Sequence, residues 1–174
     1  MSLESGSTWL EDHLQRQPKL LGIDSDYYVK LDAEDQELLQ RLSDWPIEKL
    51  LLRSTRDLRA FDSIKEYFDY CLHYKRYMFF KGRPKTSNIY PDNVHSMYSH
   101  KLDLIWHSHI LFTKEYRDFY QEVFGAFVDH IPFHGRRETP RNPNREQWRS
   151  EYKQAFGELP PDFNPKLYER PPCG

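Results

Sequence analysis

Histidines gather in one part of the chain, and histidine is the side chain best suited to proton transfer and metal binding near neutral pH. Six of the eight histidines fall between residues 95 and 134 of the 174-residue sequence: His95, His100, His107, His109, His130 and His134. The densest stretch reads Trp-His-Ser-His over residues 106–109. Chemistry that depends on imidazole is therefore concentrated in this stretch of the chain.

Helical spacing sorts these side chains into a candidate metal site. Asp103 and His107 are four residues apart and would share one face of a helix. A third ligand would come from His130, with His134 as an alternative. Imidazole and carboxylate together suit a divalent transition metal, zinc above all. Three protein ligands leave a position for water, and zinc-bound water can hydrolyse a substrate.

The same residues also have a purely structural interpretation. Asp103 can accept a hydrogen bond from the His107 ring inside an aromatic core, and His130 and His134 can bond to loop carbonyls. His109 lies two residues after His107 and would point almost the opposite way, into the core or out to solvent. The sequence leaves both interpretations open.

The elements that would position these residues are helices, and the pattern contains no convincing β alternation. The longest apolar pattern predicts one helix from about Met97 to Phe124, with apolar residues on two sides and Gly125 as its stop signal. Further helices are predicted over residues 33–44, 47–52, 61–79 and 145–156. We therefore expect an all-α fold, an irregular bundle of about four to six helices around one long central helix.

The domain boundaries follow from composition. Residues 1–23 are expected to be a flexible segment, residues 24–157 a single helical domain, and residues 158–174 a proline-rich extended tail anchored by Phe163, Leu167 and Tyr168. Cys71 falls inside a helical pattern and Cys173 lies next to the last residue, so a disulfide is not expected.

Charge and hydropathy narrow the classes of partner. The formal net charge is −2, which argues against a general nucleic-acid binder, although the segment from Arg136 to Lys153 is basic and contains Trp148 and Tyr152. A solvated face with local ion pairs is the competing interpretation of that segment. No apolar stretch is long enough to cross a membrane and no secretory signal is visible, so we expect a cytoplasmic protein without a membrane partner.

The motif around the histidines resembles a known family. Residues 103–111, Asp-Leu-Ile-Trp-His-Ser-His-Ile-Leu, followed by Tyr116, by Phe-Gly-Ala-Phe at 124–127 and by His130, resemble the signature of the glycine-rich domain-containing-protein-like family in its bacterial stand-alone form. The resemblance implies an α-helical module. It also implies functional roles at the matching positions: Asp103, Trp106, His107, His109, Tyr116 and His130.

Three functions follow as hypotheses. The first is a binding or accessory module for an unknown protein partner or small ligand, with Trp106, His109 and Tyr116 as binding residues. The second is a small zinc-dependent hydrolase with Asp103, His107 and His130 as ligands. The third is a nucleic-acid contact through residues 136–153.

Overall fold

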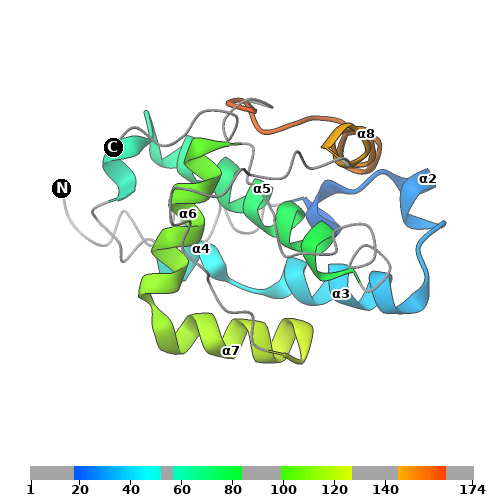
Figure 1. The fold of residues 1–174 in the computed structure, drawn as a ribbon, viewed down its shortest axis with the longest axis horizontal. Helices are drawn as coiled ribbons and strands as arrows, with labels where there is room; N and C mark the ends of the chain where they lie inside the picture. Colours follow the sequence, from blue (N-terminus) through cyan, green and yellow to red (C-terminus); the bar gives the residue numbers. More distant parts are fainter. Residues whose placement is uncertain (1–17, 52–56, 84–98, 127–144, 164–174) are drawn as a thin grey trace, which may run out of the picture.

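The computed structural model describes residues 18–51, 57–83, 99–126 and 145–163, and the all-α prediction is confirmed across these ranges (Figure 1). Five helices have 12 or more residues: α3 (Ala33–Asp44), α5 (Ile64–Gly82), α6 (His100–Leu111), α7 (Thr113–Phe124) and α8 (Arg145–Phe156). The shorter elements are η1 (Lys19–Gly22), α2 (Ser25–Tyr28), α4 (Ile47–Leu51) and η2 (Asp57–Ala60).

Local signals set the ends of these helices. Asp32, Ser63 and Ser99 each precede a helix and accept a hydrogen bond from a backbone N–H of its first turn, at 2.9–3.0 Å. Gly125 and Gly157 follow α7 and α8 with φ of 70° and 76°, the left-handed conformation that glycine adopts without strain. The predicted boundaries of α3 and α8 and the predicted ends at both glycines match these observations.

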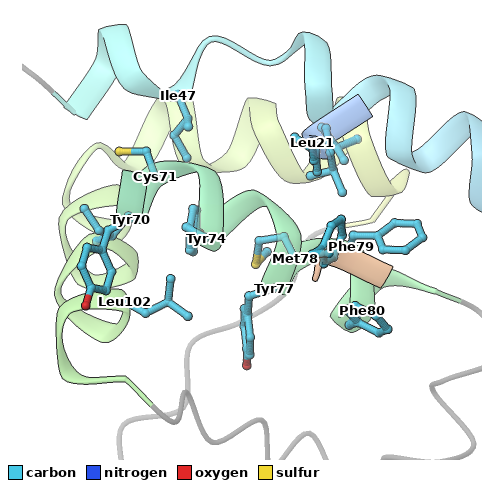
Figure 2. Packing of buried hydrophobic residues seen from close by; sticks show 14 of the residues in the cluster. Leu21, Ile47, Tyr70, Cys71, Tyr74, Tyr77, Met78, Phe79, Phe80 and Leu102 are labelled. Carbon is cyan, nitrogen blue, oxygen red and sulfur yellow. The ribbon is translucent and has the colours of Figure 1, made fainter. Parts of the chain in front are cut away.

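Helix α5 is the centre of the bundle. It contacts α3, α4, α6 and η1, and its aromatic side chains also stack against those of α8. Cys71 projects from it towards Ile47 of α4, whereas Tyr70 and Tyr77 project from the opposite side (Figure 2). Four tyrosines of α5, at positions 67, 70, 74 and 77, are 0–3 % exposed, so they act as packing groups. A helix with buried residues on all sides must be covered by neighbours all around.

The structure does not contain the single long helix expected between Met97 and Phe124. The chain breaks at Phe112, whose φ of −85° and ψ of 64° lie outside the helical range. The Phe112 N–H closes α6 on the carbonyl of His109, and the Phe112 carbonyl accepts the Tyr116 N–H to begin α7. The apolar residues predicted to line two sides of one helix are therefore divided between two helices that run in clearly different directions (Figure 1). The central helix of the bundle is α5, not this segment.

The helical domain begins before residue 24. Leu21 of η1 is buried, and its carbonyl accepts a hydrogen bond from Arg76 Nε at 2.9 Å. Leu20 and Leu21 have φ of 49° and 60°, a conformation that costs energy for residues other than glycine. Tertiary contacts, rather than local preference, therefore hold this turn against the domain.

The described part of the predicted tail also packs against the domain. The Phe163 ring stacks on Trp148 with centroids 6.0 Å apart, as expected of an anchor. Asp162 accepts hydrogen bonds from the Tyr70 hydroxyl at 2.8 Å and from the Lys101 backbone N–H at 3.1 Å. Residues 158–163 thereby connect α8 to the start of α6.

Among the described residues, none of the helices combines the length and the apolar character that crossing a bilayer requires. Cys71 is a buried free thiol, and burial raises its pKa well above the usual value. Cys173, Leu167 and Tyr168 lie outside the described residues.

Candidate functional site

The two histidines of the Trp-His-Ser-His motif lie on opposite faces of α6, as helical geometry requires. The His107 side chain is 51 % exposed, whereas His109 is fully buried. His100 is exposed at the start of α6. These side chains do not converge, so the motif supplies one surface imidazole and one core imidazole.

Asp103 and His107 do come together, but through a single ring nitrogen. His107 Nδ1 lies 2.8 Å from the Asp103 carbonyl oxygen and 3.4 Å from its carboxylate Oδ2. Both contacts use Nδ1, and the backbone bond directs the Nδ1 proton to a carbonyl. The arrangement orients the ring, in the way that residues around metal-bound imidazoles do, without making the two side chains a chelating pair.

The rest of the predicted metal site cannot be placed. His130 and His134 lie outside the described residues, as does His95. Within the described ranges, no three His, Cys, Asp or Glu side chains are grouped so that they could hold a metal ion. The zinc site therefore stays a prediction that depends on His130.

His109 is a core residue. Its Nδ1 lies 3.0 Å from the Tyr74 hydroxyl, and its ring meets those of Tyr116 and Phe119 at centroid distances of 5.0 Å. Burial lowers its pKa to about 3, so the ring is neutral at physiological pH. A side chain in this position cannot contact a ligand on the surface. His109 instead packs against Tyr116 and Phe119.

The other two predicted binding residues meet at the junction of α6 and α7. Trp106 Nε1 donates a hydrogen bond of 3.3 Å to the Tyr116 hydroxyl oxygen. In one straight helix, ten residues would separate the two by about 15 Å along the axis. The break at Phe112 therefore brings them together. Tyr116 is buried while Trp106 is partly exposed, so the indole reaches the surface on a fixed support.

The sequence did not single out Lys81, which lies in the last turn of α5. Its ammonium nitrogen lies 4.7 Å from the centroid of the Trp106 ring. Burial alone lowers the Lys81 pKa to about 8. A lysine directly after the apolar residues 78–80 is the one sequence signal that hints at this placement. We refer to Lys81, Trp106 and Tyr116 as the Trp106 site.

The sequence did not single out His73 either, a second buried histidine, which lies on α5. Its Nδ1 lies 2.9 Å from the Tyr152 hydroxyl of α8. Burial, and to a smaller extent the nearby Arg76 charge, lower its pKa to about 4. This contact holds α5 and α8 together. His73 and Tyr152 are far from Trp106 in the sequence.

The aromatic side chains of the basic segment are not available for stacking on bases. Trp148 is 5 % exposed and Tyr152 is fully buried, because both pack against α5. Arg149 pairs with Glu146 on the exposed face of α8 at 3.5 Å. Residues 136–144 lie outside the described residues. For the described half of this segment, the base-stacking expectation is wrong, because its rings contribute to the core.

A family model matches part of the chain. Residues 85–166 match the family model described as UCP032817-like, a little under half of the chain. The match takes in α6, α7 and α8, and so includes Trp106 and Tyr116 but not Lys81. No curated protein and no solved structure matches the chain. The resemblance to the glycine-rich domain-containing-protein-like family stays a prediction, and the chain is similar to UCP032817-like proteins over its second half.

Proposed function

We propose that this protein is a small helical binding module that takes up a small ligand at the Trp106 site. One observation carries the proposal: the break at Phe112 lets the Tyr116 hydroxyl hold the partly exposed Trp106 ring beside the Lys81 ammonium. Tryptophan and tyrosine provide large contact areas with little conformational entropy to lose, which suits recognition.

The residues that pack beneath the Trp106 indole hold it in one orientation, which favours a role in ligand binding. Tyr116 is 3 % exposed and its ring packs on Tyr120 at a centroid distance of 4.6 Å. The fully buried His109 ring also contacts the Tyr116 ring, at a centroid distance of 5.0 Å. A ligand would therefore meet an indole whose orientation is already set, which reduces the ordering cost of binding.

A small ligand is favoured over a protein partner by the distribution of exposed apolar side chains. In the described ranges, the large exposed hydrophobic residues are Val29, directly after α2, Ile64 of α5 and Leu111 of α6. Large contiguous apolar patches mark protein interfaces, and three large exposed apolar side chains in the described ranges offer little area for one. The expectation of a cytoplasmic protein belongs to this proposal.

The test is a fragment screen read by two-dimensional NMR of the indole N–H signals. We expect fragments that bind to shift the Trp106 signal while leaving Trp45, which packs on Phe119 by its ring edge, unchanged as an internal reference. Trp106→Leu should abolish binding of those fragments without lowering the unfolding temperature greatly. Hits that leave the Trp106 signal unmoved, or no hits at all, would overturn the proposal.

A further inference from the structure

Four cationic side chains lie over aromatic rings in the described part of the protein. Their ring partners, with distances to the centroid, are Phe156 for Arg76 at 5.0 Å, Trp106 for Lys81 at 4.7 Å, Phe79 for Arg83 at 5.4 Å, and Tyr70 for Lys101 at 5.8 Å. Each cation lies within 5.8 Å of a ring centroid, so the other contacts of the four can be compared.

Three of these cations also have a carboxylate. Arg76 lies 3.1 Å from Glu158, Arg83 lies 2.8 Å from Asp35, and Lys101 lies 2.6 Å from Glu66. The ring covers one side of each cation and the carboxylate neutralises it. This is the expected arrangement, because a partly buried cation loses hydration that an opposite charge must replace.

Lys81 is the exception. Among the residues that the structure describes, it has the ring but no carboxylate and no hydrogen-bond acceptor. Burial is the sole cause of its lowered pKa, whereas hydrogen bonding to Glu66 raises the pKa of Lys101. An ammonium group has three N–H donors, and the face of an indole satisfies them incompletely.

The position of Lys81 in the last turn of α5 does not replace the missing anion. Cations are favoured near a helix C-terminus, by about 0.3–1 kcal/mol at exposed positions. If that interaction dominated, it would keep the Lys81 pKa at or above the usual value. Burial removes hydration and lowers the Lys81 pKa, in the direction opposite to the effect of a helix C-terminus.

We propose that Lys81 binds an oxyanion, a carboxylate or phosphate group, of the ligand that the Trp106 site takes up. The inference rests on the proposed function, and it adds the chemical class of the ligand. The oxyanion supplies the partner that Arg76, Arg83 and Lys101 already have within the chain. Lysine acts as a point charge, so it suits either anion, and partial burial strengthens the attraction. The Trp106 ring, beneath the ammonium, would contact the organic part of the ligand.

The experiment measures the pKa of Lys81 by NMR of the folded full chain, with lysine ¹³C-labelled at Cε. It is titrated alone, with sodium benzoate and with inorganic phosphate, and chloride keeps the ionic strength constant. We expect a pKa near 8 without the probes. At saturation with at least one probe, we expect a rise of about one unit or more, which corresponds to a tenfold preference for the protonated lysine.

Matched variants separate charge from structure. Lys81→Met removes the ammonium but keeps an unbranched side chain, and it should abolish binding of the effective probe. Lys81→Arg retains the charge and should retain measurable binding. Lys153→Met, at an exposed position of α8, should bind like the unmodified chain. Equal loss of binding in the Lys81→Met and Lys153→Met variants would overturn the inference.

The outcomes also distinguish this inference from the proposed function. A response to benzoate alone assigns a carboxylate, and a response to phosphate alone assigns a phosphate group. A Lys81 pKa above 10 in the free protein would show that the chain already supplies the anion, and would overturn the inference. If neither probe binds while neutral fragments still shift the Trp106 signal, the oxyanion inference fails and the binding function stands.

Discussion

Trp106 Nε1 and the Tyr116 hydroxyl oxygen lie 3.3 Å apart because the chain leaves the helical path at Phe112, between the two residues. An unbroken helix would have kept the indole and the phenol on separate turns. The break at Phe112 therefore places the partly exposed Trp106 indole against the Tyr116 hydroxyl.

Tyr116→Phe should weaken the support of the indole. The change removes the acceptor of the Trp106 N–H, and we expect it to lower the free energy of unfolding by about 1 kcal/mol. The Trp106 indole proton should also shift in the NMR spectrum, because its hydrogen bond is lost. Tyr28→Phe is the control, since no hydrogen bond of the Tyr28 hydroxyl is present among the described residues. An unchanged indole signal in Tyr116→Phe would contradict the predicted contact.

Acid should destabilise the protein in a defined window. The pKa values of His73 and His109 are lowered from 6.5 to about 4 and about 3 in the folded chain, mainly by burial. The unfolded chain therefore binds protons more readily than the folded chain below pH 6.5. Stability is fully present above that pH and falls as the pH drops from about 6.5 towards 4, by up to about 1.4 kcal/mol per pH unit for each histidine.

Urea unfolding at a series of pH values measures this slope. His73→Gln removes one titrating ring, so it should reduce the slope between pH 6 and pH 4.5 although it also lowers stability at pH 7. A free energy of unfolding that does not change between pH 7 and pH 4.5 would contradict the lowered pKa values, because the folded and unfolded chains would then bind protons equally.

The buried ion pair between Lys75 and Glu48 should be sensitive to removal of one partner. Lys75 Nζ lies 3.0 Å from Glu48 Oε1, with side chains 6 % and 2 % exposed. Glu48→Gln leaves the ammonium buried without an opposite charge, and we expect a loss of about 3–5 kcal/mol in urea unfolding. The double variant with Glu48→Leu and Lys75→Met should recover much of that loss. The exposed pair of Lys65 and Asp69 is the control, and Lys65→Met should change stability little.

Gly82→Ala should destabilise the protein even though alanine is the better helix former. A Cβ at position 82 would collide with the Phe124 ring, because the end of α5 packs directly on the end of α7. Helix propensity alone predicts a gain of about 1 kcal/mol, whereas overpacking costs about 1–3 kcal/mol. We expect a net loss in thermal unfolding. The addition of Phe124→Leu should restore stability, and a more stable Gly82→Ala single variant would rule out the close contact.

The zinc hypothesis makes its own prediction. If His107 and His130 bind zinc with Asp103, zinc should raise the unfolding temperature of protein purified without a histidine tag. Neither His107→Ala nor His130→Ala should respond, whereas His100→Ala, at an exposed position of α6, should respond like the unmodified chain. No shift in the unmodified chain, together with less than a tenth of an equivalent of bound metal, would remove the hypothesis.

The parts of the fold that the sequence predicted are those set by local chemistry. Asp32 caps α3, and Gly125 and Gly157 end α7 and α8, because each signal acts within one turn of the helix that it begins or ends. The opposite orientations of His107 and His109 follow from the helical repeat in the same way. Such features require no knowledge of which helices are neighbours.

The parts that could not be predicted depend on tertiary packing. No proline or glycine marks the break at Phe112, so neither of the residues that commonly stop a helix indicates it in the sequence. Lys81 meets Trp106 across 25 positions of sequence, between helices whose packing no local pattern fixes. The burial of Trp148 and Tyr152 likewise depends on α5 as their neighbour.

The contacts of residues 158–163 have a practical consequence for anyone who shortens this protein. A chain that ends at Gly157 would remove the acceptors of Arg76 Nη1, the Tyr70 hydroxyl and the Lys101 amide in one step, because Glu158 and Asp162 provide all three. A shortened chain that ends at the last helix boundary would lose the contacts that join α8 to the first turn of α6. Any minimal fragment should therefore extend through Phe163, whose ring completes the stack on Trp148.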